Sequence, residues 1–364
     1  MKVWKQWIGV AASVAALALP APGAAQQRLE LPEGSAWTHP HAGVAFPAVL
    51  DGRVRSGASA FANDFLDVAA SYRTDDAGEE ISLFVFRNTN GSGAVWLAQA
   101  RAQIEARDIY ANPTLTFPVE PVAIGDHAAA GALAVYAAGE GSDYTSTAVA
   151  LFEMGGWYAK LRGSSKSLDP ADLREAMLAA VSAIGWPEDA AFAAAQSPVA
   201  NCAVALTFKR KSKDVKTDTT DAILQSVFGS LIQKKIAEAQ AEKAETKPTG
   251  SYCLDSVLTP TQRVYRFNAA SDAYLIAPGD SGRAILVGRS AAADLKSQLD
   301  ERKSSKERYE VQLVLPDQRI YYRLQDRLPS PTRAIELVEA QATTSTVTTW
   351  GDDTNVNLDA GVVR

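Results

Sequence analysis

The sequence predicts an α+β protein of two domains, each a mainly antiparallel β-sheet packed with helices. Three observations lead to this fold class. Short runs with alternating apolar residues recur along the chain between tight turns, which is typical of antiparallel strands. Two amphipathic helical segments interrupt these runs in the first half. The pattern is then lost at residues 190–198 (AAFAAAQSP), which we interpret as a linker.

The composition is that of an ordinary globular protein. The chain has 364 residues, of which 47% are hydrophobic and 21% charged. At about 150 residues per domain, this length predicts about two domains, each long enough to bury a sizeable core. Lysine and arginine number 36 and aspartate and glutamate 42, so the net charge is −6. This acidic balance disfavours a generally basic binding surface, and we expect no nucleic-acid partner.

Residues 1–25 have the layout of a cleaved secretory signal peptide. A short basic start precedes the apolar run Ile8–Leu19, and small residues lead to a cleavage site between Ala25 and Gln26. The run is shorter than the roughly twenty residues of a membrane span, and no later stretch is long and apolar enough to form one. We therefore expect export to the periplasm of a Gram-negative cell, with no transmembrane segment after cleavage.

The two cysteines, Cys202 and Cys253, predict a single disulfide, because exported proteins with a small and even cysteine count typically pair them. The bond would close a loop of roughly fifty residues and contribute about 4 kcal/mol by restricting the unfolded chain. Two buried free thiols are the alternative. Neither a CxxC redox motif nor a cysteine zinc cluster is present in the sequence.

After an extended lead-in at residues 26–43, the first α+β domain is predicted at residues 44–189. One helix with an apolar stripe is expected at Ala94–Asp108, and a second begins at the N-cap Asp169 and ends at Gly185. The strands are expected at Val44–Leu50, Phe65–Arg73, Glu80–Arg87, Ala132–Ala138, Thr145–Glu153 and Trp157–Gly163.

After the linker, a second α+β domain is predicted at residues 199–341, with a long amphipathic helix at residues 219–245. Residues 342–364 are rich in Thr, Asn and Asp and are expected to form a polar tail that frays. The strands are expected at Cys202–Phe208, Tyr252–Leu258, Arg263–Asn268, Ala273–Ala277, Ala284–Gly288, Tyr309–Leu315 and Arg319–Leu324, and shorter helices at Ala291–Asp300 and Ser330–Gln341.

Four segments follow one another in residues 44–186: "GVAFPAVLDG" at the entry, "ISLFVFRN" before a helix, "AVALFEMGGWYAKLRGS" as a hairpin, and "IGWP" after the last helix. In this order they resemble the PsbP-like (DcrB-like) α/β/α sandwich. The resemblance implies an exported domain that serves as an accessory to a membrane or envelope assembly. It brings no catalytic motif that could be transferred to this chain.

The string Gly279-Asp280-Ser281-Gly282 is similar to the nucleophile loop of chymotrypsin-like serine proteases, in which a histidine–aspartate pair activates the serine. This chain departs from that pattern, because Arg283 stands in place of a second glycine and all three histidines precede the linker. Without a base, Ser281 remains a weak nucleophile. A turn between two strands is the alternative interpretation. A hydrolase that uses Ser281, or a site assembled between the domains, is our second functional hypothesis.

His39 and His41 flank Pro40. In an extended segment the side chains of residues i and i+2 point the same way, so both imidazoles could contact one metal ion. Metal binding is therefore the third hypothesis. Two ligands do not complete a site, and the sequence contains no HExxH motif or further histidine cluster. The alternative is a polar entry to the first strand, and we expect no cofactor.

A cluster of basic residues precedes the long predicted helix. It could contact an anionic headgroup or an acidic partner, whereas the usual meaning of such a run is a solvated loop. No aromatic residues are interleaved, so a stacking platform for nucleic acid is not supported. The residues are Lys209, Arg210, Lys211, Lys213 and Lys216.

No complete catalytic constellation is recognisable in the mature sequence. Our first functional hypothesis is therefore a non-catalytic accessory or binding protein that is exported to the cell envelope. The partner class that fits this hypothesis is an envelope protein or a membrane-associated complex. Because catalytic residues can come together from distant positions, the hydrolase alternative stays open at this point.

Overall fold

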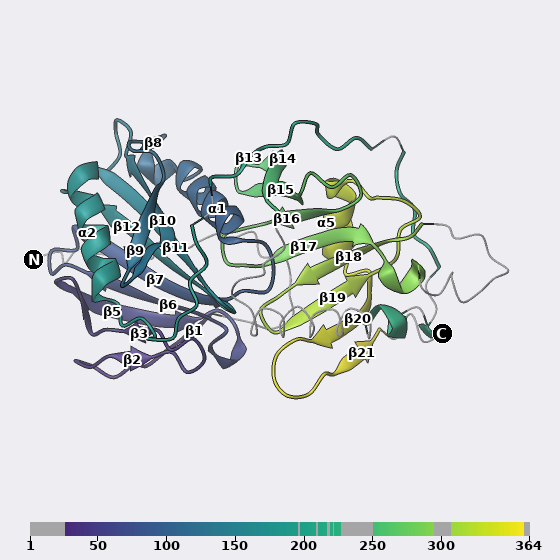
Figure 1. The fold of residues 1–364 in the computed structure, drawn as a ribbon, viewed down its shortest axis with the longest axis horizontal. Coiled ribbons are helices and arrows are strands. Elements are labelled where there is room, and N and C mark those ends of the chain that lie inside the picture. Colours follow the sequence, from purple (N-terminus) through teal and green to yellow (C-terminus); the bar gives the residue numbers. More distant parts are fainter. Residues whose placement is uncertain are drawn as a thin grey trace, which may run out of the picture.

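Two large β-sheets lie side by side in the computed structural model, with helix α1 (Gly93–Glu105) between them (Figure 1). The structure describes residues 26–195, 197–208, 210–216, 219–220, 222–226, 250–294 and 307–359. The predicted signal peptide lies outside these residues. In the described ranges, no helix is long and apolar enough to cross a membrane. The mostly antiparallel pairing of the strands confirms the predicted sheet-rich α+β class.

The first sheet is formed entirely by antiparallel neighbours. Its strands are β1 (Gln27–Arg28), β4 (Val49–Leu50), β5 (Arg53–Ala60), β6 (Asp67–Arg73), β7 (Glu79–Arg87), β8 (Thr114–Leu115), β9 (Glu120–Ile124), β10 (His127–Ala137), β11 (Ser146–Met154) and β12 (Trp157–Ser165). The order is β1-β5-β6-β7-β12-β11-β10-β8, with β4 beside β5 and β9 beside β10. Separately, β2 (Trp37–Thr38) pairs with β3 (Ala45–Phe46), and two 3-10 turns are η1 (Asn63–Phe65) and η2 (Asp108–Tyr110).

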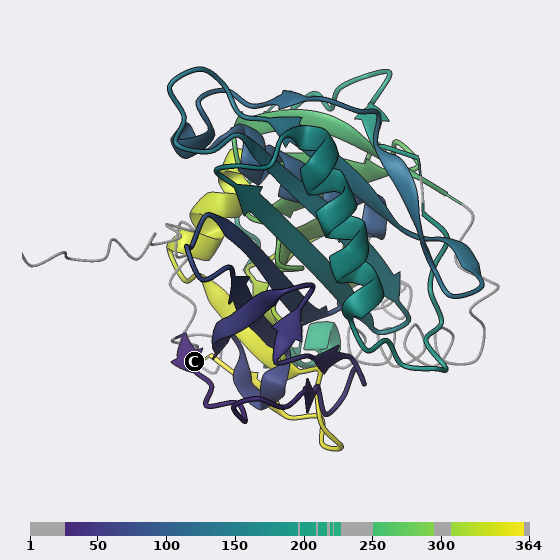
Figure 2. The same cartoon turned by 90° about the vertical axis from the view of Figure 1, so that its left-hand side faces the viewer.

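Helix α2 (Pro170–Ala183) covers the outer face of the first sheet (Figure 2). Its N-cap is Asp169, whose side chain accepts hydrogen bonds from the backbone N–H groups of Ala171 and Asp172. This cap confirms the predicted start of the helix. Leu173 and Met177 are buried against the sheet in the first hydrophobic core, which explains the apolar stripe seen in the sequence.

The second sheet is a meander of neighbouring strands. They are β13 (Ala200–Asn201), β14 (Tyr252–Thr259), β15 (Gln262–Phe267), β16 (Tyr274–Ala277), β17 (Ala284–Arg289), β18 (Tyr309–Val314), β19 (Gln318–Tyr322), β20 (Thr343–Thr348) and β21 (Val356–Leu358), paired in this order. Among the described strands of this sheet, only β13 and β14 run parallel. Helix α5 (Pro331–Glu339) lies within the predicted helix Ser330–Gln341, has Ser330 as its N-cap, and packs Leu337 into the core of this sheet.

Helix α1 is buried on both sides because each sheet contributes to the same hydrophobic cluster. The apolar residues of α1 pack with Leu151 and Tyr158 of the first sheet and with Tyr265 and Leu275 of the second. A helix that is apolar around most of its circumference is expected in an interior rather than on a surface. The two sheets thus share a core, and their division into two domains stays a prediction.

Gln99 is the only polar residue of α1 that is fully buried. Its amide nitrogen donates hydrogen bonds to the carbonyl oxygens of Thr261, Ala277 and Gly279 at 3.0–3.2 Å. Its amide oxygen accepts a hydrogen bond of 2.9 Å from the Tyr265 hydroxyl. One side chain therefore satisfies polar groups at three places in the second half of the chain.

Residues 202–208 do not form the strand that the alternation predicted. Only Ala200–Asn201 pairs with the sheet, because side chains take over the backbone groups that a strand would have paired. The Leu206 N–H donates to the Asp255 carboxylate, and the Val204 carbonyl accepts from Arg266. The predicted linker is also held in place, since the Ala193 N–H donates to Glu153 O and the Ala195 N–H donates to Ala129 O.

Two further segments differ from the sequence prediction. Strand β5 was not predicted, because its sequence RVRSGASA lacks large apolar residues. The C-terminal tail does not fray over its described part but forms β20 and the edge strand β21. Its threonines are β-branched and favour a strand, and Val347 anchors β20 in the interior.

Two predicted helices are described only in part. Of residues 219–245, positions 219, 220 and 222–226 are helical, and the rest lie outside the described residues. Of Ala291–Asp300, residues 291–294 are helical and the remainder is likewise outside.

Replacing Gln99 with alanine should lower the free energy of unfolding by about 2–4 kcal/mol, because several buried polar groups lose their partner. Urea denaturation measures this change. Gln103→Ala, on the same helix at a half-buried position, is the matched control and should cost less than about 1 kcal/mol. Equal costs for the two variants would contradict a special role of Gln99.

Candidate functional site

A cavity of about 190 Å³ lies where α1 meets β14 and β15. Its apolar wall includes Leu97 from α1, Leu254 from β14 and Val199 from the segment before β13. Its polar residues are Arg101 and Glu105 from α1 and Arg263 and Tyr265 from β15. The cavity therefore presents apolar and polar surface in about equal parts, and its size suits a ligand smaller than a drug-sized molecule.

The spacing of α1 explains why these residues share the cavity. Leu97, Arg101 and Glu105 stand four residues apart, so they lie along one face of the helix. Tyr136 on β10 fixes the two charged side chains from the first sheet: Arg101 Nε donates to the Tyr136 hydroxyl at 2.8 Å, and this hydroxyl donates to Glu105 Oε1 at 2.9 Å. Burial raises the pKa of Tyr136, so the hydroxyl keeps its proton for this bond.

The two arginines face one carboxylate at distances too long for good hydrogen bonds. Arg263 Nη2 lies 3.6 Å from Glu105 Oε2, and Arg101 Nη2 lies 3.7 Å from Glu105 Oε1. Arg263 Nε is buried and has no hydrogen-bond partner. Burial raises the pKa of Tyr265 to about 12, although the neighbouring Arg263 acts in the opposite direction. Arg101 and Arg263 bring two positive charges and Glu105 one negative charge, so these three side chains have a net charge of +1.

The predicted disulfide fixes the segment that closes the cavity. Cys202 and Cys253 are bonded, with their Cα atoms 4.9 Å apart. Cys202 directly follows β13, and its N–H donates to Leu254 O, a residue that lines the cavity. The bond thus ties the segment that carries Val199 to strand β14.

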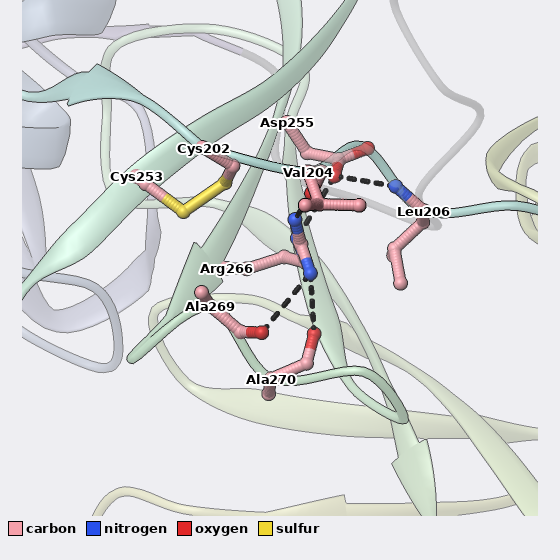
Figure 3. The surroundings of a disulfide bond; sticks show 8 residues. All are labelled: Cys202, Val204, Leu206, Cys253, Asp255, Arg266, Ala269 and Ala270. Carbon is pink, nitrogen blue, oxygen red and sulfur yellow. Dashed lines mark hydrogen bonds and ion pairs between the residues drawn. A yellow bond between two sulfur atoms is a disulfide. The ribbon is translucent and has the colours of Figure 1, made fainter.

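Arg266 reinforces the same region from inside (Figure 3). Its Nε lies 2.8 Å from the Asp255 carboxylate, and both side chains are almost fully buried. Its Nη1 donates to the carbonyl oxygens of Ala269 and Ala270. Together with its bond to Val204 O, the guanidinium joins the segment after the disulfide, strand β14 and the turn after β15.

The Gly279–Gly282 loop, predicted as a possible nucleophile loop, docks against the first sheet. Lys160 on β12 donates to Asp280 O at 3.0 Å and lies 2.7 Å from the Asp280 carboxylate. Asn90 donates to Gly282 O at 2.6 Å. Gly282 has a φ of +78°, and a Cβ there would lie 3.1 Å from the Phe86 ring. Glycine is therefore required at this position by both backbone conformation and space.

Ser281 lies at this docked loop, and the structure brings no histidine to it. Its hydroxyl accepts a hydrogen bond of 3.2 Å from Arg283, whose other terminal nitrogen lies 3.2 Å from the Asp67 carboxylate. All three histidines have neighbours elsewhere, as described below. We call the Gly279–Arg283 segment with Lys160 and Asp67 the inter-sheet latch.

In the inter-sheet latch, burial and neighbouring charges shift the pKa values of the buried groups in different directions. Burial raises the pKa of Asp67 to about 6, although Arg283 and Lys160 counteract it. Asp280 is also penalised by burial, but Lys160 and Arg162 outweigh this and lower its pKa. Burial lowers the pKa of Lys160, and Asp280 opposes that shift. Each member of the Lys160–Asp280 pair therefore favours the charged form of the other.

The structure places the two candidate metal ligands, His39 and His41, close together, but both ring nitrogens of His39 already have hydrogen-bond partners. Its Nε2 lies 2.8 Å from Phe65 O, and its Nδ1 accepts from the N–H groups of His41 and Ala42. Burial lowers the pKa of His39 to about 4, so the ring is neutral and both nitrogens are occupied. Among the described residues, no group of three or more His, Cys, Asp or Glu side chains could hold a metal ion.

The remaining histidines belong to aromatic contacts. The His41 ring lies 4.9 Å from the Trp350 ring, and His41 Nε2 lies 3.3 Å from the Asp64 carboxylate. His127 contacts Phe192 in the segment after α2. These contacts join the lead-in and the C-terminal strands around the first sheet.

The basic cluster is exposed where it is described. Arg210, Lys211, Lys213 and Lys216 are exposed, and Lys209 lies outside the described residues. The backbone N–H of Lys213 donates to the Asp326 carboxylate, which anchors this loop to the second sheet. The cluster lies apart from the cavity-lining residues in the sequence and contributes none of them.

Sequence analysis did not identify Arg101, Glu105 or Arg263 as site residues. Arg101 and Glu105 form an i,i+4 pair on a predicted helix, and this pattern usually marks a solvated helix face. Arg263 gave no signal, because its pairing with Glu105 on α1 depends on the tertiary fold. The comparisons with known proteins add no candidate: no family model, curated protein or solved structure matches this chain.

Replacing Lys160 with methionine should lower the free energy of unfolding by about 3–5 kcal/mol, because Asp280 would stay buried without its partner. The double variant Lys160→Met/Asp280→Asn should recover part of this loss. Ser281→Ala is the control within the same loop and should cost less than about 1 kcal/mol. A Lys160→Met cost as small as that of Ser281→Ala would contradict the latch.

The raised pKa of Asp67 predicts an unusual pH dependence of the free energy of unfolding. Its pKa is raised to about 6, so it contributes stability that is present below about pH 4 and lost as the pH rises through about 6. Asp67→Asn should therefore gain stability relative to the wild type between pH 4 and 7, by up to about 3 kcal/mol.

Urea denaturation at several pH values tests this prediction. Asp76 is the matched control, because hydrogen bonds from Thr74 and Gly78 lower the pKa of this exposed carboxyl. Asp76→Asn should lose stability relative to the wild type as the pH rises, which is the opposite sign. If the stability difference from the wild type changed with pH in the same direction for both variants, the proposed environment of Asp67 would be excluded.

Proposed function

We propose that this chain is an exported, non-catalytic binding protein of the cell envelope, and that its ligand site is the cavity between α1, β14 and β15. The observation that carries the proposal is the combination of an apolar wall with an incompletely paired charge group in one cavity. Such a combination can orient a ligand by its polar end and hold it by its apolar part.

The surroundings of the cavity favour binding over catalysis. Its charged residues are two arginines and one glutamate, so it offers no nucleophile next to a base. The hydrolase alternative rested on Ser281 or on a site assembled between the domains, and the loop of Ser281 is engaged in contacts between the sheets. The metal alternative rested on His39 and His41, and the ring nitrogens of His39 are already occupied. Neither alternative gains support from the geometry.

Export is supported by two independent features. Residues 1–25 have the pattern of a signal peptide with cleavage after Ala25. The Cys202–Cys253 disulfide is the bond expected in an oxidising compartment. We propose the periplasm as this compartment.

The arrangement of the first sheet supports the proposed PsbP-like relationship. Helices α1 and α2 lie on opposite faces of the sheet, as an α/β/α sandwich requires (Figures 1 and 2). An accessory role beside an envelope protein or a membrane-associated complex follows from that relationship. In this proposal, the ligand-binding protein delivers or presents its ligand to such a partner.

Native mass spectrometry of the protein purified from its own envelope tests the proposal. We expect a mature chain that begins at Gln26 and carries a small bound molecule. Ala98→Phe fills the cavity from α1 and should abolish the adduct, whereas Ala183→Phe on the exposed end of α2 should retain it. A protein without any adduct, or an adduct that persists in Ala98→Phe, would overturn the proposed ligand site.

A further inference from the structure

We infer that the cavity ligand is a small monocarboxylic acid with an apolar body, whose carboxylate is held by Arg101 and Arg263. This inference rests on the proposed function and adds the chemical class of the ligand. It is carried by the charge balance, the hydrogen-bonding state and the shape of the same cavity.

The charge balance favours a ligand with one negative charge. Arg101 and Arg263 bring two positive charges to the cavity, and Glu105 supplies one negative charge. The two arginine side chains are largely shielded from solvent, with exposures of 23% and 20%, whereas the Glu105 side chain is 37% exposed. A monocarboxylate would neutralise the excess charge, whereas a cation would add to it and a dianion would reverse it.

The hydrogen-bonding state shows where a carboxylate would be accepted. The ion pairs of both arginines with Glu105 exceed 3.5 Å, and Arg263 Nε has no partner although it is buried. A buried guanidinium N–H without an acceptor is costly, so an oxygen acceptor that reached this N–H would relieve that cost. Guanidinium groups bind carboxylates through paired N–H donors, which makes this acid the matching group.

The shape of the cavity limits the rest of the ligand. Its volume is about 190 Å³, and its wall is formed by Leu97, Leu254 and Val199. A dry apolar cavity of roughly 150 Å³ in another protein accommodates a benzene ring. An acid with an apolar body of about that size therefore fits, and Tyr265 offers an aromatic surface beside it.

Isothermal titration calorimetry of the mature protein tests the inference with three probes of one shape. Phenylacetate carries the carboxylate, phenylacetamide is its neutral counterpart, and 2-phenylethylamine is a cation. We expect binding of phenylacetate, at least tenfold weaker binding of the amide, and no binding of the amine. Equal affinity for the acid and the amide, or no binding of the acid by the wild type, would overturn the inference.

Variants assign the effect to the two arginines. Arg263→Met and Arg101→Met should each weaken phenylacetate binding at least tenfold and reduce the preference for the acid over the amide. Arg73→Met, which removes a half-exposed ion pair with Glu80, is the control and should leave both affinities unchanged. Thermal melts identify folded variants, and acid binding that survives in a folded Arg263→Met or Arg101→Met protein contradicts the assignment.

The two proposals fail in different ways. If native mass spectrometry detects a bound molecule that Ala98→Phe removes, but phenylacetate does not bind, the binding function stands and the carboxylic acid is wrong. If phenylacetate binds equally well to the wild type and to Ala98→Phe, the cavity itself is not the site, and both proposals are overturned.

Discussion

A helix enclosed by two sheets must satisfy hydrogen-bonding groups on both sides without access to water. Toward the second sheet, helix α1 meets much of this constraint with Gln99, whose side chain lies within hydrogen-bond distance of three carbonyl oxygens and accepts from the Tyr265 hydroxyl. The surrounding residues of α1 can then be apolar and can pack against both sheets. The position of the cavity follows from this arrangement, since α1 supplies one of its walls.

In the inter-sheet latch, buried charged groups must likewise find partners without access to water. Lys160 and Asp280 come from different sheets, and neither could be buried alone at a reasonable cost. Their pairing orients the Gly279–Gly282 loop, whose carbonyl oxygens accept bonds from Gln99 and Asn90. A short motif that looks like a catalytic loop in the sequence thus has a sufficient structural explanation in its contacts.

Local signals predicted the parts of the fold that depend on neighbours in the chain. The N-cap Asp169 and the helix start at Ser330 were predicted correctly, because a residue at a helix start bonds to backbone groups a few positions away. The cysteine count predicted the disulfide for a chemical reason that needs no fold. Strand β5 escaped detection, because its pairing with β6 depends on the neighbouring strand rather than on its own small residues.

The candidate site was not predictable by the same means. Arg263 and Glu105 are distant in the sequence and meet only because α1 is packed against β15. The alternation at Cys202–Phe208 suggested a strand, but buried Arg266 and Asp255 compete for its backbone groups. Such competition involves buried charges whose positions depend on the complete tertiary structure.

The disulfide also has a consequence for the order of events in the life of the protein. The disulfide attaches the segment that carries Val199 to β14. Without the disulfide, this segment is held to the sheet by the two-residue strand β13 and a few hydrogen bonds. In a reducing compartment the newly made chain would lack this covalent attachment. If the chain is exported as we propose, the bond would form only after export, and the proposed binding site would be completed at that stage.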